Sequence, residues 1–220
     1  VCDGKFKIVL ELLDDATAAK GAWDGPTEQG NATKAAADKD AMVYFGTLNS
    51  GAAKVAIPIL NQVGLAMISA ANTAVGLTKV NEPGEPEKYY PTGKRNYMRV
   101  VPADDFQGVV NANWIKGLGF KNAYVVDDTE LYGKGVADVM EKQSKSIGLE
   151  IKGRQSVAQK EMQAQANSIA VKILGTKPDV VYYGGLTESG GAVLLAELRK
   201  AGFKGVFMGP DGIQSNDFIN

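Results

Sequence analysis

Hydroxyl and amide side chains gather where an apolar segment gives way to a helix-like segment, at Thr47, Asn49 and Ser50. The start of a helix leaves backbone N–H groups free, and together with hydroxyl donors they form a site for a small anion. A looser copy of this junction occupies residues 182–191. The pair indicates two similar lobes, with a small anionic ligand held by at least one of them. The alternative for Ser50 is a plain helix N-cap.

A second polar turn follows the next apolar segment and contains Ser69 and Thr73. The small residues Ala70 and Ala71 between them would let a ligand approach the backbone. Because ligands of parallel sheets bind beyond the carboxyl ends of the strands, both turns are predicted to face one crevice. An ordinary loop that needs small residues for packing is the alternative.

Two later strand ends carry groups that could reach the same ligand. Tyr132 precedes Gly133 and Gly135, and we interpret this as a helix start with the phenol in the crevice, although a structural tyrosine fits equally. The third glycine of a dinucleotide-binding fingerprint is missing here. Asp211 lies in a Pro-Asp-Gly turn, which is either a simple turn or a carboxylate aimed at a ligand ammonium.

Composition excludes several classes of function. The 220 residues carry a net charge of −1, which argues against a nucleic-acid or anionic-membrane partner. The absence of histidine excludes Ser-His and Cys-His nucleophile pairs and His-ligated zinc. No apolar run approaches the length of a transmembrane helix, and Cys2 is the only cysteine. We therefore expect neither an enzyme nor a cofactor-dependent or membrane-spanning protein.

Apolar strand-like runs alternate with helix-like stretches along most of the chain, which predicts parallel sheets covered by helices. We expect two Rossmann-like, flavodoxin-like lobes of α/β class, residues 1–101 and 102–220, with a hinge near Pro102. Residues 81–96, rich in proline and charge, are expected to form a surface excursion, and Asp104 or Asp105 to cap the next helix. The predicted strands are residues 6–13, 41–45, 66–69, 96–101, 123–127, 150–157, 180–183 and 206–208. The predicted helices are residues 27–37, 52–62, 106–118, 133–147, 162–174 and 189–201.

Four motifs follow one another along the chain: residues 67–73, Asp128 with Tyr132 and Gly133, residues 182–185 and residues 207–212. In this order they resemble the motifs of type I periplasmic solute-binding proteins of the leucine/isoleucine/valine-binding branch. Proteins of this branch are the extracellular receptors of branched-chain amino-acid ABC importers. The resemblance covers nearly the whole chain and implies two lobes that close on a ligand between them.

The resemblance also implies roles for individual residues. Ser50 and Thr73 would bind a ligand α-carboxylate with help from the Ala71 backbone, and Tyr132 would contribute from the second lobe. Asp211 stands where the family commonly has a glutamate that faces the ligand ammonium, so its carboxylate is one methylene shorter. Two further positions depart from the family, because Leu186 replaces a frequent aromatic residue and Asn49 replaces a cysteine found in some members.

Family members begin with a strand, a ligand-binding loop and a helix that precede the segment matching residues 6–15, and they continue beyond residue 212. We therefore expect an incomplete first lobe in a chain shortened at both ends. The implied partners are a small amino-acid-like ligand and an ABC permease and ATPase, in the periplasm or outside the cell, with a lipid anchor one option for the precursor. The alternative function is a ligand-sensing domain of a receptor or regulator, and a doubly wound enzyme is the third.

Overall fold

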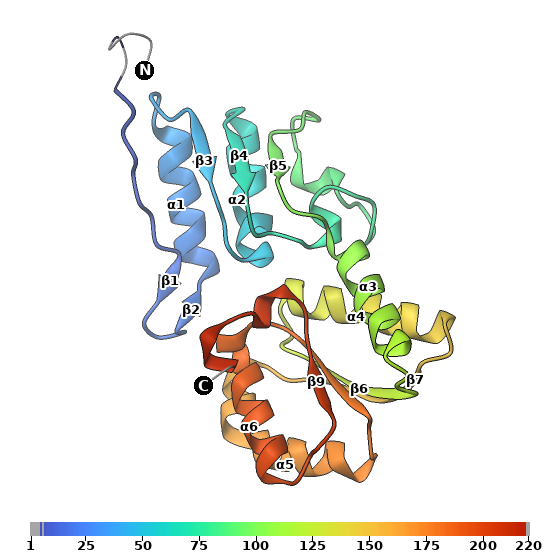
Figure 1. The fold of residues 1–220 in the computed structure, drawn as a ribbon. Coiled ribbons are helices and arrows are strands. Elements are labelled where there is room, and N and C mark those ends of the chain that lie inside the picture. Colours follow the sequence, from blue (N-terminus) through green and yellow to red (C-terminus); the bar gives the residue numbers. More distant parts are fainter. Residues whose placement is uncertain (1–4, 6, 219–220) are drawn as a thin grey trace.

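The structure is a computed structural model that describes residue 5 and residues 7–218. Two parallel sheets lie one above the other, and the chain passes from the first to the second after β5 (Figure 1). The first sheet has the order β3-β4-β5 and the second the order β7-β6-β8-β9. We call the first sheet with α1 and α2 lobe 1, and the second sheet with α3 to α6 lobe 2. This is the expected fold class.

The bounds of the elements agree closely with the predicted ranges, apart from the first predicted strand. The strands are β1 (Ala16–Thr17), β2 (Ala22–Trp23), β3 (Val43–Phe45), β4 (Ala66–Ser69), β5 (Tyr97–Arg99), β6 (Asn122–Asp127), β7 (Glu150–Ser156), β8 (Val180–Gly184) and β9 (Val206–Met208). The helices are α1 (Gly25–Ala37), α2 (Ser50–Gln62), α3 (Asp104–Gly117), α4 (Leu131–Ser146), α5 (Gln159–Gly175) and α6 (Ala192–Lys200). Short helical turns are η1 (Val75–Leu77), η2 (Glu87–Tyr89), η3 (Thr187–Gly191), η4 (Asp211–Ile213) and η5 (Asn216–Phe218).

Lobe 2 is covered on both faces of its sheet. Tyr124 and Val126 of β6 pack into a cluster with residues of α5 and α6. Val125, between them in sequence, packs into a separate cluster with residues of α3 and α4. Successive side chains of a strand point to opposite faces, so a strand buried on both faces must be apolar at every position. Residues 123–126 of β6 meet this requirement, which explains why the sequence predicted this strand well.

Lobe 1 has one covered face and one open face. Tyr44 and Met67 pack with residues of α1 and α2 in a single cluster. Val43, Phe45 and Met98 point to the opposite face of the sheet and are exposed, Phe45 by 73%. The described part of the chain therefore leaves an apolar surface of lobe 1 open, in contrast to lobe 2. An incomplete lobe 1 was expected.

The predicted strand over residues 6–13 is wrong for residues 7–13, which pair with no strand, while residue 6 lies outside the described residues. These residues are strongly exposed, including Ile8 and Leu12. An apolar composition favours a strand only where a neighbouring strand supplies hydrogen-bond partners. In the flavodoxin-like order, one more strand would separate this segment from β3, and the described residues contain no such strand.

A small hairpin precedes the first helix. β1 and β2 pair in antiparallel fashion, with Ala16 opposite Trp23. The hairpin leads directly into α1, whose N-cap Asp24 accepts hydrogen bonds from the Thr27 backbone N–H and hydroxyl. The side chain of Trp23 is therefore held at a fixed place beside the start of α1.

The predicted N-cap of α3, Asp104 or Asp105, is wrong, because Ala103 is the N-cap. Asn49 is the N-cap of α2 and Ser50 is its first helical residue, which rules out the alternative of a plain cap for Ser50. These side chains lie one or two positions inside their helices. Ser50 and Asp104 are consequently buried and free to take part in contacts elsewhere.

The two lobes are in direct contact at their junction. The backbone N–H of Asp104 donates to the carbonyl of Thr73 over 2.9 Å, and Lys79 forms an ion pair with Asp105 over 2.6 Å. Leu131, the first residue of α4, packs against the core cluster of lobe 1. The lobe boundary near residue 101 stays a prediction. Among the described residues, no helix combines the length and apolar character needed to span a membrane.

Candidate functional site

The two polar turns predicted in lobe 1 lie against each other. The side-chain amide of Asn72 donates to the carbonyls of Thr47 and Leu48, each over 2.9 Å. Ser69 donates to the same Thr47 carbonyl, also over 2.9 Å. The hydroxyl of Ser50 accepts a hydrogen bond from the Ala74 backbone N–H. These bonds fix the start of α2 beside the turn that follows β4, so Ser50 and Thr73 share one wall.

Thr73 differs from its neighbours because its hydroxyl has no partner. Its side chain is buried, yet no hydrogen bond to the hydroxyl oxygen exists within the described residues. A buried polar group without a partner is costly, and such groups often mark a place that a ligand or water completes. The hydroxyl of Thr73 is therefore the free polar group of this wall.

The other predicted lobe 1 residues have defined positions too. The backbone N–H of Ala71 donates to the hydroxyl of Ser69 over 3.1 Å. Asn49 accepts a hydrogen bond from the Thr47 hydroxyl at its backbone carbonyl, and its side chain makes no capping bond. The amide side chain of Asn49 and the first turn of α2 thus border the same polar turn.

The predicted lobe 2 residues form a second wall. The Tyr132 hydroxyl donates to Asp211 Oδ1 over 2.6 Å and accepts from the Gly212 backbone N–H over 3.0 Å. Gln107 donates to the same carboxylate oxygen over 2.9 Å. A Cβ added at Gly212 would lie 2.8 Å from both Leu186 and Tyr132, so these side chains touch the glycine. The structure therefore brings Tyr132, Leu186 and Asp211 together.

Asp104 is the site residue that sequence reasoning missed. It is fully buried at the start of α3, and neither carboxylate oxygen has a hydrogen-bond partner among the described residues. Burial raises the pKa of Asp104 to about 7, and the nearby charge of Asp211 adds to the rise. The Thr73 hydroxyl lies near enough to lower this pKa again, although its geometry to the carboxylate is not that of a hydrogen bond, and the charge of Arg99 lowers it too. Asp104 thus lies between the Thr73 wall and the Asp211 wall.

The guanidinium of Arg99, which opposes the rise in the Asp104 pKa, is already occupied. Arg99 donates to the carbonyls of Asn72 and Ala74, and also to the Thr78 hydroxyl. The uncompensated charge between the walls is therefore negative and suits a ligand ammonium. The first turn of α2, with its free N–H groups, suits a carboxylate. No group of three or more His, Cys, Asp or Glu side chains among the described residues could hold a metal ion.

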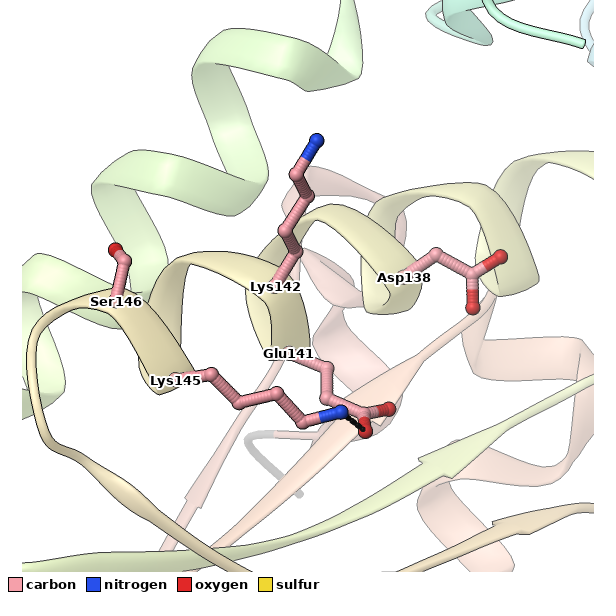
Figure 2. A pocket seen from close by; sticks show the side chains of 5 residues that line it. All are labelled: Asp138, Glu141, Lys142, Lys145 and Ser146. Atoms are coloured by element: carbon pink, nitrogen blue, oxygen red, sulfur yellow. Dashed lines mark ion pairs between the residues drawn. The ribbon is translucent and has the colours of Figure 1, made fainter.

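A depression on the outer surface of α4 is a different kind of feature. Figure 2 shows its five lining side chains on α4 alone, with Lys142 pointing away from the others. Glu141 and Lys145 form an ion pair over 2.7 Å, and the lysine side chain is 68% exposed. Charged residues spaced along a single helix face are typical of a helix surface that faces solvent. None of the predicted site residues lies there.

Comparison with known proteins identifies relatives of the whole chain. A model of the periplasmic binding protein family matches residues 4–218. The chain is 29% identical over 215 residues to the Leu/Ile/Val-binding protein BraC3 of Rhizobium johnstonii, covering 96% of this chain and 52% of that protein. It is 31% identical over 216 residues to the Leu/Ile/Val-binding protein homolog 1 of Brucella melitensis, covering 97% and 52%. The chain thus spans about half the length of the curated relatives it matches.

Solved structures share the fold. An extracellular ligand-binding receptor from Rhodopseudomonas palustris HaA2 matches with a TM-score of 0.75 at 22% identity, over 91% of this chain and 52% of that one. A leucine-binding protein from Thermotoga maritima matches with a TM-score of 0.72 at 22% identity, over 91% and 53%. The relatives of this chain are substrate-binding proteins, which are not enzymes. With two α/β lobes and a polar site where they meet, the chain belongs to the periplasmic binding protein family.

Proposed function

We propose that the chain binds an amino acid or a similar small polar solute between its two lobes, as part of the substrate-binding protein of an ABC importer. The observation that carries the proposal is the buried carboxylate of Asp104, which has no partner among the described residues and lies beside the equally unpartnered Thr73 hydroxyl. An amino acid would satisfy both groups, with its ammonium at the Asp104 carboxylate and its carboxylate at the Thr73 hydroxyl. The names of the relatives, which bind leucine, isoleucine and valine, agree with this chemistry.

Each predicted residue takes a role in this proposal. Ser50 and Thr73, with the backbone near Ala71 and the first turn of α2, receive the ligand carboxylate. Asp104 and Asp211 receive the ammonium, and Tyr132 holds Asp211 in place through its 2.6 Å hydrogen bond. Leu186 and Asn49 border the space left for the ligand side chain. An apolar Leu186 favours an aliphatic ligand over one with a polar end.

The same proposal extends to the surroundings of the protein. We expect a membrane permease and an ATPase as partners, since ABC importers need both. We place the protein in the periplasm or outside the cell, and a lipid anchor on its precursor stays a prediction. Closure of the lobes would then report ligand occupancy to the permease.

A thermal-shift panel tests the proposal with matched ligands. L-leucine, L-isoleucine and L-valine are compared with 4-methylpentanoate, which lacks the ammonium, and with 3-methylbutylamine, which lacks the carboxylate. Ligand at 100 times its Kd should stabilise the chain by about 2.7 kcal/mol, and only compounds with both groups should do so. If no amino acid raises the melting temperature, or if 4-methylpentanoate acts as well as leucine, the proposal is wrong.

A further inference from the structure

The β1–β2 hairpin brings one aromatic side chain to the edge of the candidate site. The hairpin turn is closed by hydrogen bonds from the backbone N–H groups of Lys20 and Gly21 to the Thr17 carbonyl. Lys20 also forms an ion pair with Asp24, the N-cap of α1, over 2.8 Å. Trp23 pairs with Ala16 of β1 and directly precedes Asp24, so its backbone is tied to the start of α1.

The indole of Trp23 packs against Gly51 in the first turn of α2. A Cβ built at Gly51 would lie 2.4 Å from the indole Cζ2 and 2.9 Å from Cη2. Real contacts to a Cβ are longer, so only glycine at position 51 lets the ring approach this closely. Gly51 directly follows Ser50, the residue proposed to receive the ligand carboxylate. The ring of Trp23 therefore covers the helix start on which the lobe 1 wall is built.

The other edge of the indole reaches lobe 2. Its Nε1–H donates to Glu130 Oε2 over 3.3 Å, a contact between residues 107 positions apart. Glu130 is the N-cap of α4, and the two residues after it are Leu131, which packs against the lobe 1 core, and Tyr132. One side chain thus joins the first turn of α2 to the first turn of α4, and both turns carry proposed ligand-binding residues.

We propose that Trp23 is a bridging residue that holds the two lobes together at the edge of the site. The ring is held in place by its packing against Gly51. Its N–H donates to Glu130, and this hydrogen bond exists only while α4 lies close to α2. Separation of the lobes breaks the contact with Glu130 but leaves the ring on Gly51. The effect of this bridge on ligand retention rests on the proposed function, whereas the bridge itself needs no ligand.

Single-molecule FRET on the full chain without ligand tests the bridge. Dyes are placed at Lys54→Cys on α2 and Lys142→Cys on α4, both exposed, in a Cys2→Ser background. Trp23→Phe keeps an aromatic ring but removes the N–H, and Glu130→Ala removes the acceptor. Loss of one hydrogen bond should raise the ratio of open to closed molecules about threefold to tenfold. The double variant should be no more open than either single variant, because both remove the same contact.

Further variants separate the bridge from general damage to the fold. Gly51→Ala should also raise the open fraction, because the added methyl group displaces the ring. Glu130→Gln keeps an acceptor oxygen and should behave as the unaltered chain. Trp114→Phe changes the other tryptophan, which is exposed on α3, and should have no effect.

Two results would overturn the inference. One is an open-to-closed ratio that stays unchanged in Trp23→Phe, Glu130→Ala and Gly51→Ala. The other is additive opening in the double variant. A second measurement, of ligand dissociation, keeps this test apart from the proposed function. If L-leucine binds the unaltered chain, Trp23→Phe should speed its dissociation by the same factor by which it raises the ratio of open to closed molecules. Absence of leucine binding in the unaltered chain would contradict the proposed function and leave the FRET result standing.

Discussion

Ligand affinity should depend steeply on pH through the ionisation of Asp104. In the ligand-free protein, burial raises the pKa of this carboxyl from 3.8 to about 7. An ammonium ligand binds the ionised form, so every pH unit below 7 leaves about tenfold fewer binding-competent molecules. Between pH 8 and pH 5 the competent fraction falls from about 0.9 to about 0.01, and the apparent Kd for L-leucine should rise roughly 90-fold.

The same pKa shift also predicts how the stability of the ligand-free chain depends on pH. Ligand affinity should rise with pH, whereas the free energy of unfolding should fall. A carboxyl whose folded-state pKa is raised is easier to protonate in the folded state, so its ionisation opposes folding. The penalty begins above pH 3.8, grows until pH 7 and then reaches about 4 kcal/mol, because one pKa unit corresponds to about 1.36 kcal/mol. Burial also raises the pKa values of Glu28 and Asp128, so the informative quantity is the difference between the unaltered chain and Asp104→Asn.

Calorimetric titration of L-leucine at half-unit steps from pH 5 to pH 8 measures the first effect, and urea unfolding over the same range measures the second. Asp104→Asn should flatten the pH dependence of binding, weaken affinity at pH 8 by about tenfold to a hundredfold and stabilise the ligand-free chain. Asp105→Asn is the matched control: Asp105 is partly exposed and paired with Lys79, and loss of its charge should lower the Asp104 pKa only slightly and leave the pH dependence in place. Equal pH profiles for the unaltered chain and Asp104→Asn would refute the role of Asp104.

Three further outcomes follow from the site and from the two sheets. Tyr132→Phe removes the hydroxyl that donates to Asp211 and accepts from Gly212, so thermal unfolding should show a loss of about 1 kcal/mol and calorimetry a weaker affinity for L-leucine; unchanged affinity would mean that Asp211 does not need this support. Backbone amides of β4 should exchange with solvent faster than those of β6, because one face of the lobe 1 sheet is open, and equal protection measured by hydrogen exchange would contradict this. Phe45→Ser should change the free energy of unfolding by less than about 0.5 kcal/mol while lowering the binding of an apolar dye, and a larger loss of stability would show that Phe45 is covered in solution.

The sequence predicted lobe 2 almost completely, for a physical reason. Its central strands β6 and β8 are apolar at consecutive positions, because α3 and α4 cover one face of the sheet and α5 and α6 the other. Its helices end near glycines such as Gly148, whose positive φ of 68° suits a residue without a side chain. Local patterns of this kind depend on neighbours close in sequence, and so they are visible without the structure.

The errors share one origin, which is dependence on partners distant in sequence. Residues 7–13 are mostly apolar and resemble a strand, but no strand among the described residues pairs with them. In the sequence Asp104 stands where a helix cap is expected. The burial of the Asp104 carboxylate becomes visible only in the structure, where the Thr73 segment packs against the start of α3. The contact of Trp23 with Glu130 crosses between the lobes, and nothing in the residues around Trp23 indicates it.

A crystal structure of the chain with L-leucine, or with the amino acid that gives the largest thermal shift, tests the central proposal most directly. We expect one ligand between the lobes, with its carboxylate at the Ser50 and Thr73 hydroxyls and its ammonium within hydrogen-bond distance of Asp104. Density for the ligand at any other place, with Asp104 still unpaired, would contradict the proposed binding site.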